Sequence, residues 1–271
     1  MSVPYFEITR STEALSFANR RTTVAGVAFD NVGMDEAVRE IHRQVRDGGI
    51  HHVCTGNLDH LYLLQSDPLF RRAYEAASLV LADGMPILWL SKLERRSLPL
   101  KERVAGSDLF WELAKLSHES GVTLYLLGGA PGSAEKAAQK ARERFPSVQV
   151  VGCYCPPKAT FETEEVQREI RERVLAAKPD ILLVGFGAPK QEKWILENRE
   201  ALRVPMSIGV GGTFEMAGGS VKRAPLWLQK TGMEWAFRLL QDPLRLYRRY
   251  FCHDMPFLMR TALQMVLSSV K

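Results

Sequence analysis

The most constraining feature of the sequence is a regular alternation between short apolar runs and longer stretches with the period of a helix. Seven runs rich in apolar and β-branched residues occur, at 24–29, 52–55, 79–82, 123–127, 148–152, 180–185 and 206–210. Stretches with helical spacing lie between them, at 34–46, 57–76, 107–119, 133–145, 164–177 and 190–201. Such alternation is typical of a parallel sheet covered by helices. The sequence therefore predicts a Rossmann-like α/β fold, with a mostly parallel sheet, helices on both faces and a ligand site beyond the carboxyl ends of the strands.

The pattern also divides the chain into three parts. Residues 1–21 are polar and predict a flexible lead-in, and residues 22–221 form the predicted α/β domain. From residue 222 onward the strand-like runs stop. Residues 222–271 predict a helical appendage whose pieces are separated at Gly232, Pro243 and Pro256.

Composition excludes several classes of protein. With 46% hydrophobic and 25% charged residues, the chain has enough apolar content to fold, which excludes disorder. Its four cysteines include no Cys-x-x-Cys pair, so a disulfide scaffold and a zinc ribbon are excluded and a reducing cytoplasm is expected. No stretch reaches the roughly 20 apolar residues that span a bilayer.

Polar residues follow two of the predicted strands. Thr55 and Asn57 end one apolar run and begin a helix, a position where helix capping is the favoured interpretation. Asp83 ends another run and is followed by Gly84 and Pro86. Partly apolar surroundings would raise the pKa of this carboxylate toward the range of a general base. The alternative is that Asp83 caps the helix beginning near Pro86, and the sequence slightly favours the functional role.

Three further strand-end loops are rich in glycine. Such glycines allow backbone N–H groups to approach a phosphate, although each loop alone is equally explained as a tight turn. None of the loops matches a dinucleotide fingerprint or a P-loop. Together they predict a site for a nucleotide or its diphosphate. The predicted substrate-binding positions are Gly128, Gly129, Gly185, Gly187, Gln191, Gly211 and Gly212.

No Asp-x-Asp pair occurs in the chain, although diphosphate-handling enzymes commonly hold Mg²⁺ through carboxylates. We therefore expect no metal and no cofactor, with cationic side chains neutralising the leaving group. Arg103 is one candidate for this role, and a surface salt bridge is the alternative.

The appendage combines cations with aromatic residues. Between Lys222 and Tyr250 there are seven basic and two acidic residues, an excess of 7 − 2 = +5. This composition suits an anionic membrane surface, although an amphipathic helix packed on its own core is the commoner explanation. Nucleic acid is not expected, because no nucleic-acid-reading motif accompanies the cations.

Several motifs in this order resemble those of the WecG/TagA/CpsF glycosyltransferases, glycosyltransferase family 26. They are Thr55-Gly56-Asn57, Ala82-Asp83-Gly84-Met85-Pro86, Arg103-Val104-Ala105-Gly106, Gly185-Phe186-Gly187-Ala188-Pro189-Lys190-Gln191-Glu192, Gly211-Gly212-Thr213-Phe214 and Glu234-Trp235-x-x-Arg238-Leu239. The resemblance extends from about residue 23 to residue 251. It implies inverting transfer of a sugar, such as N-acetylmannosamine or a related hexose, from a UDP-sugar to an undecaprenyl-diphosphate-linked sugar. This reaction builds bacterial surface polysaccharide, teichoic acid or capsule.

The resemblance also implies roles for single residues. Asp83 is expected to be the general base, with Thr55 also among the catalytic residues. Thr55 and Asn57 would line the sugar site, and Gln191 would contact the donor. Catalysis would then lie in the 22–221 domain.

The arginines of the appendage complete the implied site. Arg238 would stabilise the diphosphate leaving group, and Arg245 and Arg248 are expected to bind substrate beside it. The appendage would place the protein at the cytoplasmic face of the bacterial plasma membrane as a peripheral protein.

Two other functions compete with the transferase. A nucleotide-sugar-binding module without activity, recruited to the membrane by its appendage, has the same motifs. A nicotinamide-dependent oxidoreductase is disfavoured, because Gly185 and Gly187 lack the third glycine of the fingerprint. The sequence leaves the donor sugar, the acceptor and the polymer open, and a homo-oligomer is compatible with it.

Overall fold

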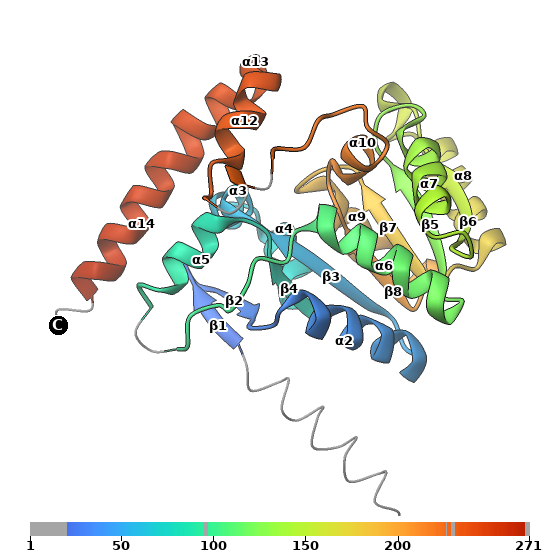
Figure 1. Ribbon diagram of the computed structural model, residues 1–271, viewed down its shortest axis with the longest axis horizontal. Helices are drawn as coiled ribbons and strands as arrows, with labels where there is room; N and C mark the ends of the chain where they lie inside the picture. Colours follow the sequence, from blue (N-terminus) through green and yellow to red (C-terminus); the bar gives the residue numbers. More distant parts are fainter. Residues whose placement is uncertain (1–20, 95–96, 226, 229–230, 269–271) are drawn as a thin grey trace, which may run out of the picture.

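The computed structural model describes residues 21–94, 97–225, 227–228 and 231–268. Its centre is a sheet of six strands in the order β4-β3-β8-β7-β5-β6, all parallel (Figure 1). The strands are β3 (His51–Gly56), β4 (Leu79–Ala82), β5 (Thr123–Gly128), β6 (Gln149–Tyr154), β7 (Ile181–Gly185) and β8 (Met206–Gly209). The predicted parallel α/β sheet is therefore confirmed.

Helices cover both faces of this sheet, as predicted. One face packs against α2 (Met34–Asp47), α6 (Gly106–Ser120) and α7 (Ser133–Arg144), and α10 (Thr213–Ala217) lies against the last two. The other face packs against α8 (Glu164–Ala177) and α9 (Lys190–Leu202) at one end. At the other end it packs against α3 (Leu58–Leu63), α4 (Pro68–Glu75) and α5 (Met85–Ser91). Leu124 and Leu126 enter the first core, whereas Tyr125 and Leu127 enter the second. Burial on both sides explains why these strands read as continuous apolar runs.

The prediction that residues 24–29 form one strand of the main sheet is wrong. Residues 24–29 do not join the main sheet but belong to an antiparallel hairpin, β1 (Arg21–Val24) and β2 (Val27–Asp30). Ala25 and Gly26 form its two-residue turn, with positive φ angles of 49° and 80°. This is the backbone geometry that reverses a strand directly, so the apolar run is folded in two.

The predicted helix over residues 57–76 is also wrong in part. It consists of α3 (Leu58–Leu63) and α4 (Pro68–Glu75). The side chain of Asp67 accepts a hydrogen bond from the Phe70 N–H at 3.0 Å and caps the second helix. Pro68 cannot donate a backbone hydrogen bond to the preceding turn, so it starts a helix instead of continuing one.

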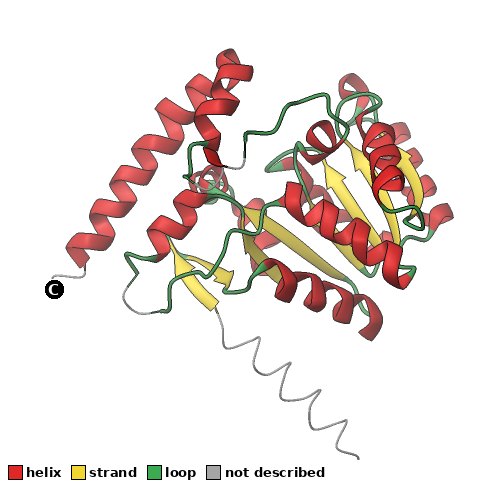
Figure 2. Cartoon of the chain, viewed as in Figure 1, coloured by secondary structure: helices red, strands yellow, loops and turns green. Residues whose placement is uncertain are grey.

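The C-terminal segment is helical, as predicted, and returns to the carboxyl end of β4. It contains α12 (Glu234–Gln241), α13 (Pro243–Tyr247), the π-helical segment η2 (Arg248–Asp254) and α14 (Met255–Ser268). In Figure 1, α14 runs beside α5 (Met85–Ser91), and η2 contacts α3. Figure 2 shows the long connection that carries the chain from α10 across to these helices.

Of the three predicted breaks, Gly232 lies just before α12 and Pro243 begins α13, but Pro256 lies inside α14, which continues from η2. Just before it, the Met255 N–H donates to the Tyr250 carbonyl five residues back. The regular α-helical hydrogen bonds are therefore already interrupted at the position where Pro256 has no N–H to donate, and the helix continues through the proline.

Two further predictions concern the N-terminal lead-in and the membrane. Apart from Arg21, which begins β1, the predicted lead-in lies outside the described residues. Among the described helices, none is both long enough and apolar enough to cross a membrane.

Candidate active site

A cavity of about 170 Å³ lies where the C-terminal helices meet the carboxyl end of β4. Its polar lining consists of Asn57, Asp83, Arg103, Glu234, Arg238, Arg249 and Asp254. Its apolar lining includes Met85, Trp89, Trp235, Tyr250, Met255 and Leu258. The cavity therefore joins the two segments that the sequence singled out separately, and it places charged groups beside apolar ones.

Asp83 directly follows β4 and is partly exposed to the cavity. Its backbone N–H donates to the Gly56 carbonyl at 2.7 Å, which fixes the residue against the end of β3. Its carboxylate accepts the Gly106 N–H at 3.3 Å, at the first residue of α6. Gly84, not Asp83, stands at the N-cap of α5, and no side chain caps that helix. The capping alternative for Asp83 is thus wrong, and the carboxylate is available to the cavity.

The electrostatic surroundings of Asp83 suit a base. Burial raises the pKa of its carboxyl above the ordinary value. Arg238 and Arg103 oppose this rise by favouring the charged form, and Glu234 adds to it. A carboxylate with a raised pKa is a stronger base while still able to ionise, which is what proton abstraction from a hydroxyl requires.

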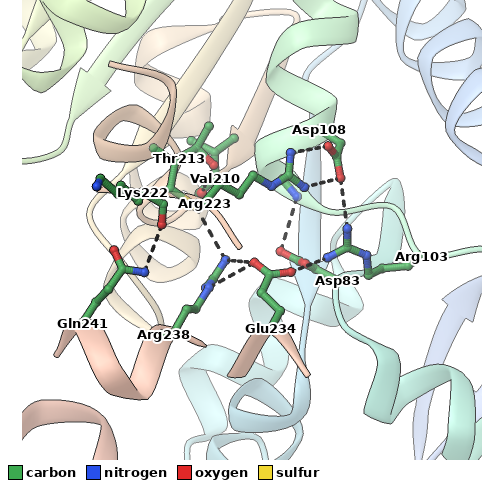
Figure 3. A network of polar contacts seen from close by, with 12 residues as sticks. Asp83, Arg103, Asp108, Val210, Thr213, Lys222, Arg223, Glu234, Arg238 and Gln241 are labelled. Carbon is green, nitrogen blue, oxygen red and sulfur yellow. Dashed lines mark hydrogen bonds and ion pairs between the residues drawn. The ribbon is translucent and has the colours of Figure 1, made fainter. Parts of the chain in front are cut away.

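Opposite Asp83, three arginines and two acids form one chain of ion pairs (Figure 3). Arg223 holds Asp108 with two hydrogen bonds, one of them 2.6 Å long, and Asp108 contacts Arg103 at 3.2 Å. Arg103 reaches Glu234 at 2.9 Å, and Glu234 contacts Arg238 at 2.7 Å. Two residues that the sequence singled out, Arg103 and Arg238, are therefore brought together across 135 positions of the chain, since 238 − 103 = 135.

Asn57 is both a helix cap and part of the cavity wall, the two roles that the sequence left open. Its side chain caps α3 by accepting the His60 N–H at 3.2 Å, and it also lines the cavity. The Arg249 guanidinium lies 3.5 Å from the same amide oxygen and pairs with Asp254 at 3.3 Å. Burial raises the pKa of Asp254 to about 6, against the opposing charge of Arg249.

The other predicted arginines lie elsewhere. Arg248 is exposed and is not part of the lining, whereas its neighbour Arg249 is. The side chain of Arg245 lies outside the described part of the structure. Arg248 and Arg249 are neighbours in the π-helical segment η2 (Arg248–Asp254), and only the second of them reaches the cavity.

Thr55 lies beneath the site instead of in its wall. It is 3% exposed, and its hydroxyl donates to the Gly209 carbonyl at 2.9 Å. This bond joins the carboxyl ends of β3 and β8. In this geometry Thr55 positions the strands that carry the neighbouring loops.

Gln191 is likewise buried, at 2% exposure, and holds two of the glycine loops together. Its side-chain oxygen accepts the N–H groups of Gly187 at 3.1 Å and of Gly211 at 3.0 Å. Its amide donates to Glu192 at 2.8 Å. The N–H groups of these two loops thus have an acceptor within the protein, and Gln191 links one loop to the other.

The third glycine loop is packed in the same way. The Gly129 N–H donates to the Gly185 carbonyl at 2.9 Å, and the Ala130 N–H donates to Glu215 at 2.7 Å. A Cβ atom on Gly128 would lie 2.9 Å from the Gly185 carbonyl oxygen. These glycines permit close approach between loops, while Gly212 is exposed beside them. These contacts bring the cluster together at the ends of β5, β7 and β8, but none of its members lines the cavity around Asp83.

Comparison with known proteins identifies the family. A model of the family described as "Glycosyl transferase WecG/TagA/CpsF family" matches residues 22–270. The chain belongs to this family. It is similar to the N-acetylglucosaminyldiphosphoundecaprenol N-acetyl-beta-D-mannosaminyltransferase of Bacillus spizizenii, with 29% identity over 193 residues, 71% of this chain and 72% of the relative. The protein of the same description from Staphylococcus aureus is 28% identical over 230 residues, 84% of this chain and 87% of the relative.

The resemblance inferred from the motifs is thereby confirmed, and the family match covers both the α/β body and the appendage. Several contributors to the site nevertheless received no role from sequence reasoning, although Glu234 stands in one of the motifs. They are Asp108, Arg223, Glu234, Arg249 and Asp254. For Glu234 a signal existed, because it precedes Arg238 by four residues on one helix, the spacing of an ion pair. The others become visible only when distant segments meet.

The predicted absence of a metal stays a prediction. Within the described residues, no group of three or more His, Cys, Asp and Glu side chains is placed to hold a metal ion. The acids of the cavity wall are instead engaged by arginines, as with Glu234 and Asp254.

Proposed function

We propose that this chain is an inverting transferase that moves N-acetylmannosamine, or a closely related hexose, from a UDP-sugar to an undecaprenyl-diphosphate-linked sugar. Membership of the glycosyltransferase family and the descriptions of the two relatives support the reaction class and the acceptor. The single observation that carries the mechanism is the position of Asp83, facing a cavity whose wall also holds Arg103 and Arg238.

Direct displacement at an anomeric carbon divides its work between two groups. A base removes the proton from the acceptor hydroxyl, and positive charge stabilises the diphosphate that leaves on the other side. Asp83 supplies the first, with a raised pKa and a fixed backbone. Arg103 and Arg238 supply the second. The oxygen of the acceptor bonds to the anomeric carbon as the bond to the UDP oxygen breaks, which inverts the centre.

Metal independence is part of this proposal. The two guanidinium groups take the role that Mg²⁺ has in many diphosphate-handling enzymes. Transfer in the presence of excess chelator tests it directly. Full turnover with EDTA supports the arginine-based mechanism, whereas loss of turnover restored by Mg²⁺ contradicts it.

The C-terminal helices also fit an acceptor carried on a membrane lipid. They expose large apolar side chains on α12, α13 and α14, among them Leu240 at 82%, Leu244 at 95% and Met259 at 68%. Large exposed apolar side chains of this kind are characteristic of interaction surfaces. We infer that this surface docks on the anionic inner face of the plasma membrane, with Arg248 and the other cations adding electrostatic attraction.

The competing function is a nucleotide-sugar-binding module without activity. Asp83→Asn separates the two, because it removes the base while keeping size and hydrogen bonding. For a transferase, we expect turnover to fall by about 10²- to 10⁴-fold with UDP binding retained. Asp35→Asn, on the exposed side of α2, is the matched control. A panel of UDP-sugars with a short-chain lipid-diphosphate acceptor then identifies the donor. Undiminished turnover of Asp83→Asn contradicts the base assignment, and absence of turnover in the parent protein with every donor favours the binding module.

A further inference from the structure

Glu234 occupies the position where the proposed reaction needs an anion. Its two carboxylate oxygens contact the guanidinium groups of Arg103 at 2.9 Å and of Arg238 at 2.7 Å. These are the arginines assigned above to the diphosphate of the donor. A carboxylate that bridges two guanidinium groups makes the same charge-assisted contacts that a phosphate would make. Glu234 therefore stands in for the leaving group while the donor is absent.

The charge of the site supports this view. Three arginines, Arg103, Arg223 and Arg238, lie among three carboxylates, Asp83, Asp108 and Glu234. With Asp83 ionised, these six charges cancel. A diphosphate brings at least two further negative charges into the same space, so binding is unfavourable unless a carboxylate moves away.

Glu234 is the acid best placed to move. Asp108 is held by two hydrogen bonds from Arg223 in addition to its contact with Arg103. Glu234 instead belongs to the appendage, as the first residue of α12, and is 14% exposed. It contacts the α/β body through Arg103, across 131 positions of sequence. The connection just before it contains Gly232, with a φ of 77°.

We infer that Glu234 is a displaceable counter-ion, a positioning residue that holds Arg103 and Arg238 in place until the donor diphosphate binds and replaces it at both guanidinium groups. The inference rests on the proposed function. Before donor binding, Glu234 keeps the two arginines aligned and keeps α12 against the body. After transfer, its return to the arginines competes with UDP and promotes release of this product.

The experiment is a calorimetric titration of the full chain with UDP and, separately, with uridine, which lacks the diphosphate. Glu234→Gln removes one negative charge close to the phosphates, so we expect its Kd for UDP to fall by about five- to tenfold at low salt. The Kd for uridine stays unchanged. In turnover assays the variant shows a lower donor KM, a lower kcat and stronger inhibition by UDP. A purely structural role would instead raise the Kd for UDP and the donor KM, because loss of arginine alignment weakens donor binding, so the direction of Kd and KM separates the two roles.

Two matched variants isolate the cause. Glu197→Gln, exposed on α9, changes the net charge equally and should leave UDP affinity unchanged. Gln241→Ala removes a contact from α12 to the Lys222 carbonyl without changing the charge of the site. If loosening α12 were sufficient to tighten UDP binding, this variant would reproduce the effect, and the counter-ion role would be refuted.

The outcomes separate this inference from the proposed function. If the parent protein does not bind UDP, the proposed donor is wrong. If it binds UDP and Glu234→Gln binds it equally or more weakly, only the counter-ion role is overturned. Should Glu234→Gln fail to fold, Glu234→Ala replaces it, because it removes the same negative charge. It must tighten UDP binding in the same direction for the inference to stand.

Discussion

Arg238→Gln offers a sharp test of the proposed mechanism, because this side chain acts on both sides of the reaction. It lies beside the site assigned to the leaving group and contacts Glu234 at 2.7 Å and 3.1 Å. It is also the strongest of the influences that lower the pKa of Asp83, ahead of Arg103. The substitution removes one positive charge and keeps a polar, shorter side chain.

Two effects of defined size and sign follow. Loss of one preorganised donor to the developing negative charge should lower kcat by about 10²- to 10³-fold. Removal of the charge also disfavours the ionised form of Asp83, whose pKa is already raised by burial, and the pKa rises further. Since the base works only when ionised, the acidic limb of the kcat/KM profile must move to higher pH.

The assay is UDP release with a short-chain acceptor, followed across the acidic to neutral range. Arg238→Lys restores the charge, so the acidic limb should return toward that of the parent protein although kcat stays reduced. Arg72→Gln, on the exposed surface of α4, is the control for net charge. An acidic limb that stays in place or moves to lower pH in Arg238→Gln would refute the coupling between Arg238 and Asp83.

Three further predictions concern the supports of the site. Thr55→Val removes the donor to the Gly209 carbonyl and should lower the free energy of unfolding by about 1–3 kcal/mol, while Thr55→Ser retains stability; equal denaturation midpoints for all three proteins would contradict this role. Burial raises the pKa of Glu192 to about 7 from 4.5, so its favourable contribution is complete below pH 4.5 and is lost as pH rises through 7. Glu192→Gln should therefore be the more stable protein at pH 8, by roughly 3 kcal/mol at most. Thermal melts at pH 8 in which the variant unfolds at the same temperature as the parent, or at a lower one, would contradict this prediction. Gly232→Ala would place a Cβ atom 2.5 Å from the Trp89 ring, at a positive φ, and should reduce turnover while the α/β body keeps its circular-dichroism signal; unreduced turnover would contradict it.

The parallel sheet could be predicted because its signal is local. Strands buried on both faces must be apolar throughout, and helices that cover them must repeat their apolar positions with helical spacing. The run 24–29 was misjudged for a related reason. Its turn is formed by Ala25 and Gly26, and alanine carries no strong signal for the positive φ that it adopts there.

Prediction of the site was uneven for a physical reason. Asp83 was found because an acid at the end of an apolar strand is unusual within its own segment. Its cavity was not, because Arg103 and Glu234 meet only after the appendage folds back. Gln191 was assigned to the donor from its motif, yet in the structure its side-chain oxygen holds Gly187 and Gly211. No local pattern tells whether a polar side chain points toward a ligand or toward a neighbouring loop.

The sequence by itself determined the layers of the fold, the position of Asp83 at the end of a strand and the cationic, aromatic character of the appendage. These properties follow from hydrophobic spacing and from residue types within one segment. Tertiary structure alone decided which arginine enters the cavity, Arg249 instead of Arg248, and which acid neutralises Arg103 and Arg238. Pairing of charges depends on distances of a few ångströms between segments more than a hundred residues apart, and only the packed chain sets those distances.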